Sequence, residues 1–300
     1  MKKKVIISIL SITLLLSFVL NGQTQINQIN SSNNYVFIFQ GYDYSSKLSD
    51  TIKYIFKDLI KPDDQLTIVT PLKSYSFSQK TRKSLSQDKL IKLTIKVLKR
   101  DIINSATKYQ AVLSAMLSNV NEIGSILGIN NRGGMTSRAT SSSSLKPALV
   151  SYHQLLEELH NLRKFNEVQL INLAKLSKNF NGKKYIFIVY QKELKIIPNR
   201  KTMDVLRNNN NIKFDVLEAF LHDKNKEFLD SKKIINTLNE SDITFNFIYF
   251  KSKPKRIRGV QLKEFSGDIY NSFSKIAKGT GGKIITTSKP KVALKNILKK

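Results

Sequence analysis

The sequence of 300 residues contains no cysteine and only three histidines. Without cysteine, the chain forms no disulfide, carries no lipid attached to a cysteine and performs no thiol chemistry. It also lacks a glycine-rich phosphate loop ending in Lys-Ser/Thr and the Gly-x-Ser-x-Gly elbow of hydrolases. Because no catalytic pattern is present, we expect a protein that is not an enzyme and that needs no cofactor.

Acidic residues are scarce. The chain has 22 acidic and 50 basic residues, a net charge of +28, and residues 251–300 alone carry +12. Such a charge favours contact with nucleic acid, acidic glycans or lipid headgroups. A general bias toward lysine in the composition is the alternative explanation.

The N-terminus has the pattern of an export signal. Lys2, Lys3 and Lys4 precede an apolar run over residues 5–20, which is short for a membrane-spanning helix of about 20 residues. We therefore predict a signal peptide over residues 1–22 and a polar linker over 23–34, with an uncleaved membrane anchor as the alternative. The expected location is the periplasm, the cell envelope or the exterior.

Five apolar runs are typical of buried strands: residues 35–40, 65–70, 184–190, 243–250 and 283–286. Residues 73–78 alternate with period two and predict an edge strand that forms a hairpin with the second run. Helical periodicity separates most of the other runs. The chain is therefore expected to be an α/β protein with a doubly wound, mostly parallel sheet and an antiparallel edge hairpin.

Residues 86–127 and 147–180 both show long helical patterns, separated by a stretch rich in Gly, Asn and Ser at 128–144. We interpret them as an antiparallel helical hairpin, or coiled coil, inserted over residues 86–180. Two or three shorter helices lying on the domain are the alternative. The 128–144 tip is a candidate contact surface.

Two of the histidines share a helix face with one acid, since His153, Glu157 and His160 are spaced i, i+4 and i+7. That spacing is compatible with metal ligation. The leucine stripe through Leu155 and Leu159 lies on about the opposite side, which favours a solvated polar face instead.

The order of elements, and above all the closing segment, resembles a von Willebrand factor A-type domain. A helix with Ile269, Phe273 and Ile276 leads into Gly279-Thr280-Gly281-Gly282, a short strand and a final helix. The likeness covers about residues 35–80 and 183–300. It implies one such domain over residues 35–300, interrupted by the hairpin.

Many members of that family bind a divalent metal through Asp-x-Ser-x-Ser after the first strand and Asp after the fourth. Gln40 and Gln191 stand where those aspartates are expected, with Asp43-x-Ser45 as a shifted remnant. Lys192 would repel a cation. The resemblance therefore implies a degenerate metal slot, formed by Gln40, Asp43, Ser45 and Gln191, and no bound metal.

Basic residues follow two of the strands at the edge where open α/β sheets bind their ligands. The candidate ligand-binding residues are Lys192, Lys195, Lys253, Lys255, Arg256 and Arg258. Two functions remain open. One is an exported, non-catalytic protein-binding or scaffolding module; the other is an electrostatic binder of anionic polymer or of a membrane surface.

Overall fold

The computed structural model describes residues 32–129, 145–163, 165–209, 212–221, 229–252 and 256–299. The chain divides into two compact units, Met1–Ser32 and Asn33–Lys300, and the described helices and strands belong to the second. The predicted signal peptide, most of the linker and nearly all of the hairpin tip lie outside the described residues. Among those residues, no helix is both long and apolar enough to cross a bilayer.

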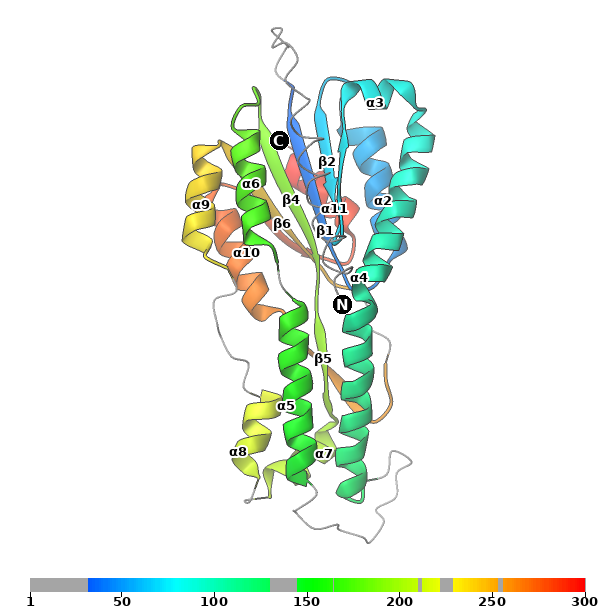
Figure 1. Ribbon diagram of the computed structural model, residues 1–300, viewed down its shortest axis with the longest axis vertical. Coiled ribbons are helices and arrows are strands. Elements are labelled where there is room, and N and C mark those ends of the chain that lie inside the picture. The colour runs from blue at the N-terminus through cyan, green and yellow to red at the C-terminus, as the bar shows by residue number, and fades with distance from the viewer. Residues whose placement is uncertain are drawn as a thin grey trace, which may run out of the picture. The chain divides into compact units, whose positions relative to one another are not determined.

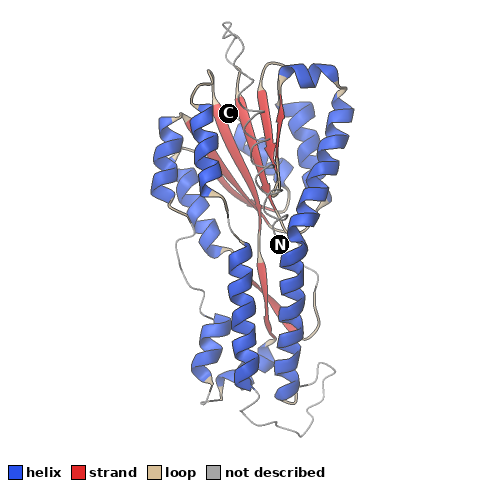
Figure 2. Ribbon diagram, viewed as in Figure 1, coloured by secondary structure: helices blue, strands red, loops and turns tan. Residues whose placement is uncertain are grey.

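A six-stranded sheet forms the centre of this unit, in the order β3-β2-β1-β4-β6-β8 (Figures 1 and 2). Every neighbouring pair is parallel except β2–β3, so the predicted α/β class and antiparallel edge hairpin are confirmed. The strands are β1 (Asn34–Gln40), β2 (Gln65–Val69), β3 (Ser74–Phe77), β4 (Lys184–Gln191), β6 (Ile243–Phe250) and β8 (Ile284–Thr287).

Helices cover both faces of the sheet, which explains why β1, β4 and β6 are continuously apolar. The face with Phe37 and Phe39 packs against α2, α11 and the first half of α4, while the face with Val36 and Ile38 packs against α6, α9 and α10. The helices of the unit are α2 (Ser46–Tyr54), η1 (Ile55–Leu59), α3 (Gln79–Ser84), α4 (Gln87–Ile126), α5 (Leu145–Leu162), α6 (Glu167–Ser177), α7 (Arg200–Arg207), α8 (Lys213–Val216), η2 (Leu217–Leu221), α9 (Ser231–Glu240), α10 (Gly267–Gly279) and α11 (Pro290–Leu298).

The first arm of the predicted hairpin is a single helix, α4, of 40 residues. Ser86 caps it by accepting from the Lys89 N–H. Its first half lies on the sheet, and its second half runs beyond the strand ends beside α5 (Figure 1). The buried Asn119 side chain joins the two helices by donating to the Ala148 carbonyl at 3.1 Å.

The second arm is not one helix, and the prediction of a continuous helix over 147–180 is wrong. It divides into α5 and α6, and Asn166 caps α6 by accepting from the Gln169 N–H. Arg163 lies at the break and is 2% exposed. The break turns this arginine inward, where the buried Glu193 and the partly buried Asp268 compensate its charge.

Two further strands that the sequence analysis did not predict, β5 (Leu194–Pro198) and β7 (Val260–Glu264), pair antiparallel in a separate ribbon. The ribbon lies beyond the carboxyl ends of the sheet, beside the second half of α4 (Figure 1). We call this ribbon, together with the second half of α4, α5, α7, α8 and η2, the ribbon module. One apolar core runs from the sheet into the ribbon module without interruption.

The Gly-Gly turn before β8 has a steric cause. A Cβ on Gly282 would lie 1.8 Å from the carbonyl oxygen of Phe245 in β6, and Gly281 has φ of +70°. Only glycine allows both the turn and this approach of two backbones. The turn therefore positions β8 against β6.

Candidate binding site at the carboxyl ends of the strands

The carboxyl ends of β1 and β4 lie side by side, because Gln40 pairs with Tyr190 in the parallel register. The strand order reverses at this point, and open α/β sheets usually bind ligands there. The Gln191 side chain fills the space between the loops. Its Oε1 accepts from the N–H groups of Tyr42 at 2.9 Å and Asp43 at 3.0 Å.

Gln191 also joins a third loop, since its Nε2 donates to the Ser252 hydroxyl at 2.9 Å. A Cβ on Gly41 would lie 2.8 Å from Gln191 Oε1, so glycine gives this amide room. The glutamine is thus a neutral bridge between the loops that follow β1, β4 and β6.

The degenerate metal slot does not fit a divalent cation. The Gln191 oxygen already accepts two N–H groups, and the Ser45 hydroxyl accepts the Lys47 N–H at the start of α2. Asp43 is exposed. No group of three His, Cys, Asp or Glu side chains converges as a metal site within the described part of the chain.

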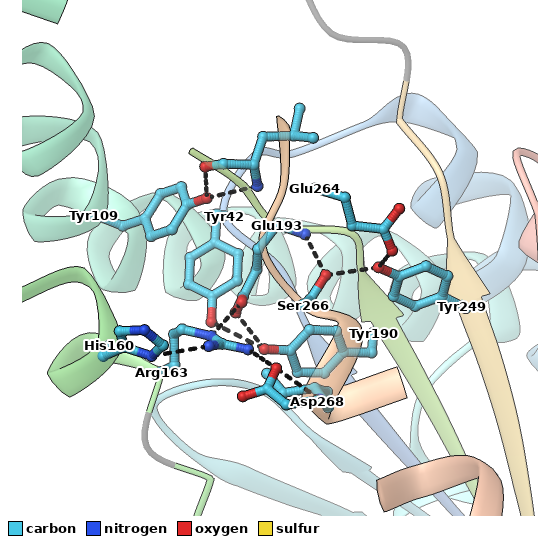
Figure 3. A network of polar contacts seen from close by, with 12 residues as sticks. Tyr42, Tyr109, His160, Arg163, Tyr190, Glu193, Tyr249, Glu264, Ser266 and Asp268 are labelled. Atoms are coloured by element: carbon cyan, nitrogen blue, oxygen red, sulfur yellow. Dashed lines mark hydrogen bonds and ion pairs between the residues drawn. The ribbon is translucent and has the colours of Figure 1, made fainter. Parts of the chain in front are cut away.

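A buried polar network lies beneath this slot, at the junction of the sheet and the ribbon module (Figure 3). Arg163 donates from Nε to Glu193 Oε2 at 2.5 Å and also pairs with Asp268 at the start of α10. Tyr190 donates to the same glutamate, and its hydroxyl lies 3.3 Å from that of Tyr42. The network therefore connects α5, β4, α10 and the loop after β1.

The side chains of Arg163 and Glu193 are 1% and 0% exposed. Burial acts to lower the pKa of the guanidinium, but Glu193 and Asp268 outweigh it and raise that pKa above its ordinary value. Burial also raises the pKa of the Tyr190 hydroxyl well above its usual range. These groups face one another rather than solvent, so we interpret the network as a structural connection.

The outer edge of β5 is satisfied by tyrosine hydroxyls instead of a further strand. Tyr109 of α4 donates to the Leu194 carbonyl at 2.9 Å and accepts from the Leu194 N–H at 3.1 Å. Tyr152 of α5 donates to the Ile196 carbonyl at 2.8 Å. The two long helices are thereby hydrogen-bonded to the ribbon between them.

A groove of about 760 Å³ opens between α4, the ribbon and the strand-end loops. Its size is within the usual range for ligand pockets. This strand-end groove is lined by Tyr42, Asp43, Tyr44, Ile103, Tyr109, Leu113, Leu117, Gln191, Lys192, Leu194, Ile196, Ser252, Ile257 and Leu262, among others. It combines tyrosines and leucines with a few polar groups, and Ile103 at its border is 48% exposed.

The structure separates the predicted basic residues. Lys192 lines the groove, where its ammonium pairs with Glu264 at 2.5 Å. Arg256 and Arg258 are exposed next to the far end of β7, where the Gly259 carbonyl accepts from Asn199. Lys253 and Lys255 lie outside the described residues.

The assignment of Lys195 to an exposed basic face is wrong. Its side chain is 0% exposed, and its ammonium lies 5.6 Å from the centre of the Phe265 ring. Successive residues of a strand point to opposite faces, and Lys195 points inward because it belongs to β5 rather than to a loop.

Sequence reasoning missed Arg163, Glu193 and Asp268 as a buried charged group. A charge at the end of a leucine-rich helix has the same pattern whether it faces solvent or turns inward. His160 was predicted to face solvent, yet it is half-buried, with its ring 4.4 Å from that of Phe265 and its Nδ1 3.2 Å from Arg163 Nη1. The sequence pattern gave no indication of these contacts.

No protein-family model matches this chain, and no curated protein sequence matches it significantly.

Proposed function

We propose that this chain is an exported, non-catalytic protein-binding module of the von Willebrand A type that does not depend on a metal. The strand order β3-β2-β1-β4-β6-β8 with an antiparallel edge supports the family likeness. Lys2, Lys3 and Lys4 before the apolar run at residues 5–20 support export.

The strand-end groove is the observation that carries the binding function. It lies at the ligand edge of the sheet, and Gln191 bridges the loops there in place of the carboxylates of a metal site. Tyrosine is enriched in protein-binding hot spots, and the groove offers the partly exposed Tyr44 together with the exposed Ile103. The partner therefore contacts the groove directly.

Co-purification from the cell envelope tests this proposal. The full chain should retain a protein partner equally well with and without Mg²⁺, and at low and high salt. Leu117→Arg, which places a charge in the groove, should lose the partner. Val168→Arg, on the exposed surface of α6, is the matched control and should retain it. Loss of the partner on removing Mg²⁺, or its retention by Leu117→Arg, would contradict the proposal.

A second candidate function is binding to anionic polymer or lipid. The exposed Arg256 and Arg258 favour it, and the Asn199–Gly259 hydrogen bond brings the backbone next to Arg258 close to the start of α7, where Arg200 is also exposed. Such binding weakens steeply as salt rises. The double variant Arg256→Glu/Arg258→Glu should reduce binding to DNA or anionic vesicles, and unchanged binding would exclude this role.

A further inference from the structure

The backbone groups of β7 alternate in direction. Phe265 N–H donates to the Glu193 carbonyl at 3.0 Å, which sets the phase of the ladder. Because bonded and non-bonded pairs alternate between antiparallel strands, Lys263 turns its N–H and C=O toward β5 and Leu262 turns them outward. The outward-facing residues of β7 are therefore Val260, Leu262 and Glu264.

The opposite strand confirms this phase. Leu194 and Ile196 face Glu264 and Leu262 in the register, and their backbone groups point away from β7, where the Tyr109 and Tyr152 hydroxyls bind them.

The two edges of the ribbon differ in how they are satisfied. The tyrosines cap the edge of β5. In the residues that the structure describes, no hydrogen bond reaches the outward N–H and C=O of Leu262. The Leu262 side chain lines the strand-end groove, so this open edge borders an apolar surface. A free strand edge beside apolar surface is a template for strand addition.

We propose that β7 takes up an extended segment of the partner protein as a third strand of the ribbon. This inference rests on the proposed function and names the form of the partner. Alternate side chains of that segment enter the groove next to Leu262, in contact with Leu113 and Ile257. The five residues of β7 offer about 17 Å of edge at 3.4 Å per residue.

Charge defines the other face of the added segment. Gln261 and Lys263 point to the side opposite Leu262, so alternate side chains of the added segment lie beside them on that side. Lys251 and the exposed Arg256 lie on the segment that leads into β7. The partner segment therefore alternates apolar with acidic residues.

A blocked, dye-labelled heptapeptide of alternating valine and aspartate is the probe, measured by fluorescence anisotropy against the full chain. It should bind with saturation. A valine–lysine heptapeptide of the same pattern, and a valine–aspartate peptide with proline at its centre, should each bind at least about 10-fold more weakly, because one reverses the charge and the other removes a donor and breaks the strand. No saturable binding of the first peptide, or equal binding of all three, would overturn the proposal.

Variants of Leu262 test the backbone contact itself. Leu262→Pro removes the outward N–H but leaves the ladder donors Gln261 and Lys263 in place, as proline does at an open edge. Leu262→Ala is the matched control for the lost side chain. The proline variant should bind the heptapeptide about 2- to 10-fold more weakly than the alanine variant, because that factor corresponds to the loss of one backbone hydrogen bond. Equal affinities would overturn strand addition, and the proline-containing peptide gives the same test should the proline variant not fold.

The two proposals fail separately. If Leu262→Pro retains the partner protein in co-purification as fully as Leu262→Ala does, strand addition is wrong while the binding function stands. If the peptide binds through the edge but no protein is ever retained, strand addition stands and the proposed function falls.

Discussion

The sheet and the ribbon module are stabilised in different ways. β1, β4 and β6 are buried on both faces by aromatic and aliphatic side chains, and each fully buried side chain such as Phe37 or Phe187 contributes about 1.5–3 kcal/mol. The ribbon module has the same apolar core on one side, but tyrosine hydroxyls close the edge of β5 and buried charges join the module to the sheet. Apolar burial tolerates small changes of geometry, whereas a buried polar contact depends on its partner being in place.

The largest expected effect is at the junction of the two regions. Arg163→Ala leaves Glu193 buried without its guanidinium and should cost about 3–5 kcal/mol of unfolding free energy in urea titration. Arg100→Ala is the matched control, since its guanidinium is half-exposed and Asp101 keeps hydrogen bonds from Thr70 and Tyr75. Similar losses of unfolding free energy in the two variants would show that the junction contributes no more to stability than a half-exposed ion pair.

The sheet side has its own steric test. Gly282→Ala forces a methyl against the Phe245 carbonyl, so β6 and β8 must separate, at a cost of about 3 kcal/mol. A Cβ on Gly267, at the start of α10, meets no atom within 4 Å. Gly267→Ala should therefore leave the thermal midpoint unchanged or slightly higher, and an equal loss in both variants would contradict the steric explanation.

The ribbon side should respond to loss of a single hydroxyl. Tyr152→Phe leaves the buried Ile196 carbonyl without this donor and should destabilise by about 1–3 kcal/mol, with faster hydrogen exchange at the amides of β5. Tyr270→Phe is the control, because no hydrogen bond of its hydroxyl occurs among the described residues. If both variants behaved alike, the tyrosine caps would not distinguish the ribbon from the sheet.

The smallest expected effect is a pH dependence at the junction. Burial, followed by Arg163, lowers the pKa of His160, while Asp268 and Glu157 act to raise it and Lys195 to lower it. Below about pH 6.5 the unfolded chain binds the proton more readily than the folded one, so stability should fall as the pH drops. His160→Gln should flatten the curve of unfolding free energy against pH between pH 7 and 5. An unchanged slope would exclude His160 as its source.

The sheet was predictable because its strands are long apolar runs. Residues 184–190 and 243–250 have no helical period and are bounded by polar stretches, so their class, and the edge hairpin at 73–78, followed from pattern alone. The 40 residues of α4 followed from periodicity in the same way.

The ribbon was not predictable by the same means. β5 begins only two residues after β4 and ends in Pro198, and β7 follows a basic loop, so both lacked the features of a strand. Their pairing depends on long-range contacts that no local pattern encodes. Lys195 was misassigned for this reason, and Gln191 was recognised as a departure from a metal site but not as a bridge between three loops.

The route of the chain has a consequence for how the protein assembles. Asn34 of β1 pairs with Lys184 of β4. β5 pairs with β7, although all of β6 lies between them in the sequence. Contacts so distant in sequence form only when long loops close, and this slows folding. During synthesis, β1 can therefore pair with β4 only after the entire α4–α6 segment has been made. The ribbon of β5 and β7 can form only after residue 264 has been made. A truncated chain that ends before β7 would keep most of the sheet but leave β5 without a partner strand.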